Sequence, residues 1–209
     1  MKLLVIDDHA VVRKGLVQIL EEASFTVQVH EAGRGEDVLD MVRSTPYDVI
    51  ILDLHLPGMS GFQVLEQLQT VHPDIPVIIL SMHDEEEYGV RVLRAGASGF
   101  VAKGTDPDVI LDAVQRVATG KRYISPALAE HLLVALDTDT DRSPHETLSD
   151  REFEVFRRIV DGQSVTEIGK ELHLSVKTIS TYRTRILEKL SMDSNADLVK
   201  YAVRHGIVA

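Results

Sequence analysis

Short apolar runs alternate with segments of helical periodicity through the first 120 residues. The apolar runs are rich in β-branched residues and cover residues 3–7, 26–30, 48–53, 76–81 and 99–102. Apolar residues recur every three or four positions in the segments that follow them, at 10–22, 34–44, 60–71, 85–95 and 107–119. This alternation is typical of parallel βαβ units, so we expect a doubly wound α/β domain with five strands and five helices.

The pattern changes after residue 120. An apolar helical stretch near 126–136 is followed by the polar, acidic segment DTDTDRSPHET, which lacks core-forming residues and predicts a linker. Four serines that can cap helices then precede amphipathic segments, namely Ser149, Ser164, Ser175 and Ser194. We therefore predict a first domain at 1–120, a linker at 121–146 and a small all-α domain of four helices at 147–209.

Charge and composition narrow the functional classes. The chain of 209 residues has a net charge of −11, all of it in residues 1–142 (12 Lys/Arg and 23 Asp/Glu), whereas residues 143–209 are neutral (10 and 10). The absence of cysteine excludes a disulfide scaffold and a thiolate zinc site. No apolar run could span a bilayer, and the first residues are too charged for a signal peptide, so we expect a cytoplasmic protein without a membrane partner.

Polar residues stand at the ends of four apolar runs: Asp7 and Asp8, Asp53, Ser81 and Lys103. Because ligands bind at the carboxyl ends of parallel strands, we expect these side chains to meet in one cleft. Oxygen ligands of this kind suit Mg²⁺, and a carboxylate beside the metal can attack a phosphoryl group to give an aspartyl phosphate. Lys103 and Ser81 would then neutralise and hydrogen-bond the phosphoryl oxygens.

Other interpretations of these positions are weaker. Acids at strand ends are often solvated loop residues or helix caps. This interpretation can explain a single acid such as Asp8, but it explains all five strand-end positions together much less well. A phosphohydrolase with an aspartyl nucleophile uses a second aspartate two residues further on, where this chain has His55. We interpret His9 as a residue that supports the pocket or caps a helix.

These positions, together with DLHLPGMSG at 53–61, resemble the receiver domain of two-component response regulators. The resemblance implies a (βα)5 flavodoxin-like fold and phosphorylation of Asp53 by a sensor histidine kinase. It also implies that Mg²⁺ is held by the carboxylates of Asp7, Asp8 and Asp53 and by the backbone carbonyl of His55.

The resemblance further implies a switch that senses the phosphate. Ser81 would turn toward the phosphoryl group beside Lys103, and Phe100 would follow inward. Many relatives carry threonine and tyrosine at the positions of Ser81 and Phe100. Because phenylalanine has no hydroxyl, its signal in this chain would be steric only.

The segment 165–190 has the form of a helix–turn–helix. Apolar residues at helical spacing predict one shared core, formed by Ile168, Leu172, Ile179, Ile186, Leu187 and Leu190. Between residues 175 and 190 four cations face Glu188 alone, a net charge of +3. An ordinary basic amphipathic helix has this composition too, but such a helix in the major groove would pair its cations with phosphates and read base edges with its polar side chains.

The phrase L-S-x-R-E at 148–152, followed by GQSVTEIGKELHLSVKTISTYRTRILEKL, resembles the LuxR-type helix–turn–helix. Joined to a receiver, it is similar to the NarL/FixJ family over essentially the whole chain. The resemblance implies base contacts from Ser180, Thr181 and Thr184. It implies phosphate contacts from Lys177, Thr178, Tyr182, Arg183 and Arg185, and contacts between DNA-bound domains through the last helix at 194–205.

The sequence therefore predicts a transcription regulator rather than an enzyme, in which phosphorylation of Asp53 controls DNA binding. Its expected partners are DNA, a sensor histidine kinase, a second copy of the chain in the active state, and RNA polymerase. The alternative is a regulator that binds DNA independently of phosphorylation and whose receiver serves only partner contact. Equal operator affinity with and without a phosphodonor would distinguish this alternative.

Overall fold

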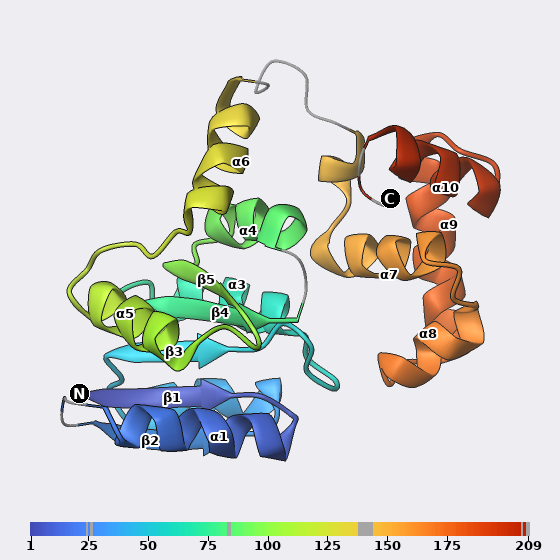
Figure 1. Ribbon diagram of the computed structural model, residues 1–209. Coiled ribbons are helices and arrows are strands. Elements are labelled where there is room, and N and C mark those ends of the chain that lie inside the picture. Colours follow the sequence, from blue (N-terminus) through green and yellow to red (C-terminus); the bar gives the residue numbers. More distant parts are fainter. Residues whose placement is uncertain (24, 26, 83–84, 138–143, 206, 208–209) are drawn as a thin grey trace. The chain divides into compact units, whose positions relative to one another are not determined.

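The computed structural model describes the chain except for residues 24, 26, 83–84, 138–143, 206 and 208–209 (Figure 1). The chain divides into two compact units, Met1–Leu136 and Asp137–Ala209. Each unit has its own core.

The first unit is built on a five-stranded parallel sheet in the order β2-β1-β3-β4-β5. Its strands are β1 (Lys2–Ile6), β2 (Gln28–Ala32), β3 (Val49–Leu52), β4 (Val77–Ser81) and β5 (Gly99–Ala102). This order confirms the predicted doubly wound, flavodoxin-like fold, in which the sheet is extended in both directions from β1 and β3. The predicted second strand began at residue 26, which lies outside the described residues, and the observed strand begins at Gln28.

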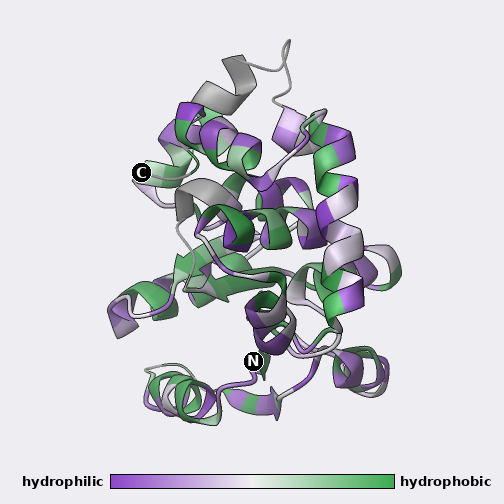
Figure 2. Cartoon of the chain, turned by 90° about the vertical axis from the view of Figure 1, so that its right-hand side faces the viewer, coloured by the Kyte–Doolittle hydropathy of each residue, from purple (hydrophilic) through white to green (hydrophobic). Residues whose placement is uncertain are grey.

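Helices lie on both faces of this sheet. The helical elements of this unit are α1 (Ala10–Glu21), the 3₁₀ turn η1 (Gly35–Asp37), α2 (Val38–Ser44), α3 (Gly61–Val71), α4 (Glu85–Arg94), α5 (Pro107–Ala118) and α6 (Pro126–Asp137), of which α6 packs on α4. Figure 1 shows α1 and α5 in front of the sheet and α3 behind it. One apolar cluster joins alternate strand residues to α1 and α5 through Leu16, Leu20, Ile110 and Val114. The central strands are therefore buried on both faces, and most of the sheet is green in Figure 2.

The predicted helix at 34–44 begins with the short 3₁₀ turn instead of a full helical turn. The backbone at Gly35 passes so close to the loop before α3 that an added Cβ would lie 2.7 Å from the carbonyl oxygen of Met59. This close approach involves residues far apart in sequence, so periodicity alone could not indicate it.

The segment after α5 packs on the first unit. Tyr123 pairs with Gly99 beside β5, and its N–H donates to the carbonyl of Ser98 at 2.9 Å. Leu128 of α6 is fully buried, and it fills the space that a side chain at Gly89 of α4 would occupy. The first compact unit thus includes much of the segment predicted as a linker at 121–146. Residues 138–143 of that segment lie outside the described residues, and the predicted domain limits stay a prediction.

The second unit consists of η2 (Pro144–Thr147), α7 (Asp150–Val160), α8 (Val165–Glu171), α9 (Val176–Leu190) and α10 (Asn195–Arg204). The predicted serine caps are present: Ser149 and Ser164 form capping boxes with Glu152 and Glu167, and Ser175 and Ser194 accept hydrogen bonds from the backbone of α9 and α10. The predicted core residues Ile168, Ile179 and Ile186 are fully buried. No helix among the described residues is long and apolar enough to cross a membrane.

Candidate functional site

The pocket at the carboxyl edge of the sheet is formed by residues that directly follow three strands. Asp7 follows β1, Asp53 follows β3, and Lys103 follows β5. The parallel register places Ile6 beside Leu52, and the N–H of Asp53 donates to the carbonyl of Ile6 at 2.9 Å. Asp7 and Asp53 are each only 1% exposed, and the Lys103 side chain is 7% exposed. The structure therefore brings together side chains that lie far apart in sequence, with Asp53 and Lys103 separated by 50 positions.

Lys103 joins the two buried carboxylates. Its Nζ lies 2.6 Å from Asp53 Oδ2 and 2.8 Å from Asp7 Oδ2. The other oxygen of each carboxylate accepts a backbone N–H, that of His55 at 3.2 Å for Asp53 and that of His9 at 2.7 Å for Asp7. Both carboxylates are thus oriented from two sides.

Burial has the largest effect on the ionisation of Asp53. It raises the pKa of this carboxyl from 3.8 to about 6, although Lys103 acts in the opposite direction. Burial alone would lower the pKa of Lys103, but Asp53 and Asp7 outweigh it, and the pKa is raised above 10.5. Lys103 is therefore charged at neutral pH, and Asp53 is an ionised carboxylate of high basicity.

The donor set of this pocket fits a divalent cation. Ligand atoms of Asp7, Asp8, His9 and Asp53 all lie within 4.8 Å of one another. Asp7 Oδ2 and Asp8 Oδ1 are buried but accept no well-aligned hydrogen bond, although Lys103 and His9 lie close. Carboxylate oxygens of this kind are the ligands that Mg²⁺ prefers. The sequence singled out both aspartates but did not assign the imidazole of His9 to the donor set.

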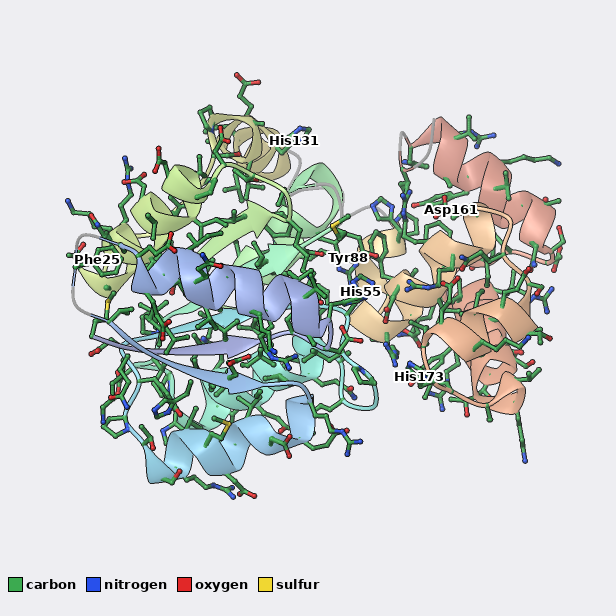
Figure 3. All side chains as sticks on the ribbon, turned by 60° about the horizontal axis from the view of Figure 1, so that its bottom comes forward. Phe25, His55, Tyr88, His131, Asp161 and His173 are labelled. Atoms are coloured by element: carbon green, nitrogen blue, oxygen red, sulfur yellow. The ribbon has the colours of Figure 1, made fainter. Side chains whose placement is uncertain are left out.

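Ser81 and Phe100 occupy the neighbouring strands. Ser81 ends β4 and is fully buried, and its carbonyl accepts the N–H of Lys103 at 2.7 Å. Phe100 lies in β5 opposite Ile79 and is 0% exposed, so its ring is already inside the unit. His55, labelled in Figure 3, lies in the loop after β3, and its side chain is half-buried.

The basic helix α9 presents the predicted DNA-contact residues on its outer side. Lys177, Ser180, Thr181, Thr184 and Arg185 are exposed, whereas Thr178, Tyr182 and Arg183 are half-buried.

Four of these side chains already make contacts within the unit. The hydroxyl of Thr178 lies 2.7 Å from that of Ser175. Thr181 and Thr184 donate their hydroxyls to carbonyls one turn back on α9, at 2.9 and 3.1 Å. Arg183 donates Nε to Asn195 Oδ1 of α10 at 2.6 Å, a partner that the sequence did not indicate.

The strand order, the acidic pocket at the sheet edge and the capped helix–turn–helix define a protein class in which a receiver domain is joined to a DNA-binding domain. Residues 3–115 match the family described as response regulator receiver domain. Residues 146–202 match the family described as bacterial regulatory proteins, luxR family.

Whole-length relatives agree with both matches. The chain is 38% identical to the response regulator GacA of Pseudomonas syringae pv. syringae, over 100% of this chain and 98% of GacA. It is 34% identical to the response regulator UvrY of Escherichia coli K12, over 99% and 95%.

Solved structures show the same architecture. The RcsB response regulator of Salmonella typhimurium matches with 26% identity and a TM-score of 0.59, over 97% of this chain and 98% of RcsB. RcsB in complex with DNA matches with a TM-score of 0.60 at the same identity and coverage. The chain belongs to the two-component response regulators of the NarL/FixJ type, which are DNA-binding transcription regulators.

Proposed function

We propose that Asp53 is the phosphoacceptor of this regulator and that its phosphorylation by a sensor histidine kinase controls DNA binding by α9. The observation that carries this proposal is the contact of Lys103 with both Asp53 and Asp7, at 2.6 and 2.8 Å in a buried pocket. A cation held beside a buried, oriented carboxylate is what phosphoryl transfer to that carboxylate needs.

The proposed transfer forms one bond and breaks one. An Asp53 oxygen attacks the phosphorus of a phosphohistidine, the phosphorus–nitrogen bond breaks, and the electron pair stays on the imidazole of the kinase. The N–H of His55 keeps Asp53 oriented, and Lys103 neutralises charge on the phosphoryl oxygens. Mg²⁺, held by Asp7, Asp8, Asp53 and the carbonyl of His55, would supply further charge neutralisation.

The same residues offer a route from the pocket to the rest of the unit. Phosphorylation would exchange the Lys103–Asp53 ion pair for a contact between Lys103 and a phosphoryl oxygen. A backbone hydrogen bond already holds Ser81 beside Lys103. The hydroxyl of Ser81 would therefore be near enough to donate to another phosphoryl oxygen. We propose that this shifts the population of two receiver conformations rather than building a new fold.

On the DNA side, we propose that Ser180, Thr181 and Thr184 read base edges. Lys177, Thr178, Tyr182, Arg183 and Arg185 would hold phosphates. Single hydroxyls discriminate bases weakly, so binding of two copies to two half-sites would supply much of the specificity.

The wider assignments rest on this proposal. We propose a homodimer in the active state, RNA polymerase as a further partner, a cytoplasmic location and a regulator rather than an enzyme. The solved RcsB structures described as dimers bound to DNA support the dimeric arrangement.

Labelling with a phosphodonor tests the acceptor. Asp53→Asn abolishes incorporation of phosphate from acyl phosphate or from the phosphorylated kinase, whereas Asp74→Asn, a matched change at an exposed loop, leaves it intact. Undiminished labelling of the Asp53→Asn protein would remove Asp53 as the acceptor.

The alternative is a regulator that binds DNA without phosphorylation and whose receiver serves only partner contact. Selection of bound DNA from a random pool, with and without acyl phosphate and Mg²⁺, separates the two functions. Enrichment that depends on the donor supports phosphorylation control, and equal enrichment supports the alternative.

A further inference from the structure

The loop that joins β3 to α3 begins at Asp53, the proposed phosphoacceptor. Near its start, the N–H of His55 donates to Asp53 Oδ1 at 3.2 Å. At its end, the N–H of Gly61 donates to the carbonyl of Leu54 at 3.0 Å. The path of this loop therefore determines where the N–H of His55 points and how the Asp53 carboxylate is oriented.

The outer part of this loop is held by Glu36 of the 3₁₀ turn η1. Glu36 Oε1 accepts the N–H of Met59 at 2.9 Å, across 23 positions of sequence. The same carboxylate fills the space that a side chain at Gly58 would need, and the φ of +75° at Gly58 also favours glycine. Gly35, the neighbour of Glu36, passes close to the carbonyl of Met59, so η1 and the loop also approach each other at the backbone.

The surroundings of Glu36 indicate a role in positioning more than in folding. Its side chain is exposed, so one hydrogen bond from it adds little to the stability of the unit. A carboxylate acceptor nevertheless makes a charge-assisted hydrogen bond, which is shorter and stronger than a neutral one. A displacement of about 1 Å at the reacting atoms costs on the order of a hundredfold in rate. The bond from Glu36 to the loop therefore matters more for the chemistry of Asp53 than for the fold.

We propose that Glu36 is a positioning residue for the phosphorylation of Asp53, acting through its hydrogen bond to the N–H of Met59. By holding the outer part of the loop, Glu36 keeps the N–H of His55 against Asp53 Oδ1 while Lys103 contacts Oδ2 at 2.6 Å. The carboxylate of Asp53 thus keeps one orientation toward the incoming phosphorus. This inference rests on the proposed function, because it requires Asp53 to be the phosphoacceptor.

Amide hydrogen exchange of the full-length protein, followed by nuclear magnetic resonance, tests the contact itself. Glu36→Ala is expected to speed exchange of the Met59 N–H by about tenfold, the factor that corresponds to one lost hydrogen bond. Glu36→Gln keeps a carbonyl acceptor and should restore most of the protection. Asp37→Ala, a matched change at the exposed neighbouring acid of η1, leaves it unchanged. Equal exchange in the wild-type and Glu36→Ala proteins would overturn the proposal.

Phosphorylation of the same variants by acyl phosphate measures the consequence. Glu36→Ala lowers the maximal rate on the order of tenfold and leaves the half-saturating donor concentration unchanged, because it disturbs orientation and not donor binding. Glu36→Gln keeps most of the rate, and Asp37→Ala keeps all of it.

Two results of this comparison would overturn the proposal. One is a wild-type rate in the Glu36→Ala protein. The other is an equal loss in the Glu36→Gln protein, because the negative charge and not the hydrogen bond would then be responsible. Undiminished labelling of the Asp53→Asn protein would instead contradict the proposed function, so the two failures are distinguishable.

Discussion

At the scale of single residues, Asp53 shows how burial sets the behaviour of one carboxyl group. The side chain is 1% exposed, and its pKa is raised to about 6 although Lys103 is only 2.6 Å away. In the unfolded chain the same group has its ordinary pKa of 3.8. The folded state therefore binds a proton on Asp53 more tightly than the unfolded state does, and its ionisation costs stability.

Asp53→Asn is expected to stabilise the protein at pH 8. The contribution of the protonated carboxyl is complete below pH 3.8 and is lost as the pH rises through about 6, whereas the amide has no charge to bury. The expected gain at pH 8 without divalent ions is on the order of 2–3 kcal/mol. Urea unfolding at pH 8 and pH 4 measures it, and a variant less stable than wild type at pH 8 would contradict the burial argument.

Arg183 provides a prediction for DNA binding at the same scale. Its Nε donates to Asn195 Oδ1 of α10 at 2.6 Å, which holds the guanidinium in place. Arg183→Ala is expected to weaken binding to all sequences and to reduce the slope of log K against log salt by about 0.9. Filter binding at several salt concentrations measures this slope. Lys121→Ala, which removes one exposed charge from the first unit, outside the predicted contacts, should leave it unchanged.

The residues of the pocket could be predicted from the sequence where each of them directly follows a strand. Asp7, Asp53 and Lys103 meet because each directly follows a strand of one parallel sheet. The contact of Arg183 with Asn195 and the approach of His9 to Asp8 depend on side-chain rotamers and loop paths, which periodicity does not report.

At the scale of elements, local sequence determines most helix starts. The box Ser164–Glu167 satisfies backbone N–H groups at both positions, as its spacing predicts. The starts of the four helices of the second unit were accordingly predictable from serines. The left-handed backbone of His173 and Ser191 was not, because neither residue is a glycine or an asparagine.

Replacing this cap gives a graded prediction. Ser164→Ala is expected to destabilise the second unit by about 1 kcal/mol, because the N–H of Glu167 loses its acceptor, while Ser164→Gly costs only a few tenths of that. Thermal unfolding followed by circular dichroism compares the two variants. Equal losses would mean that the side-chain oxygen contributes nothing.

The packing of α6 on α4 depends on the absence of a side chain at Gly89. A Cβ there would lie 2.5 Å from Cδ1 of Leu128, so Gly89→Ala is expected to displace α6 at a cost of roughly 1–3 kcal/mol. Leu128→Ala removes the clash, and the double variant should lose less stability than the sum of the single variants. Strict additivity in urea unfolding would show that the two residues do not compete for the same space.

At the scale of the whole molecule, the two units differ in net charge, as their proposed functions require. The net charge of −11 lies entirely in residues 1–142, while the neutral remainder concentrates its cations on α9. The fold of each unit could be predicted from hydrophobic periodicity and helix-capping residues. The extent of the first unit could not be predicted in this way, because the packing of α6 depends on one glycine and one leucine that belong to different helices.

Fragments measure where the first unit ends. A fragment of residues 1–136 is expected to be more stable than one of residues 1–120 by roughly 2–5 kcal/mol, because the shorter fragment lacks buried Leu128. It also lacks the pairing of Tyr123 with Gly99. Equal unfolding midpoints would place the limit at residue 120, as the sequence predicted.

Lys103 contacts both Asp7 and Asp53, so the folded state does not require a bound metal ion to hold these two carboxylates together. Since an internal ammonium already offsets much of the repulsion between the buried acids, chelation with EDTA is expected to leave the chain folded and to lower its unfolding midpoint only by the amount that corresponds to the binding free energy of the ion. Only phosphate incorporation should stop. A cell short of divalent ions would thus keep an intact but silent regulator, ready to respond as soon as the ions return.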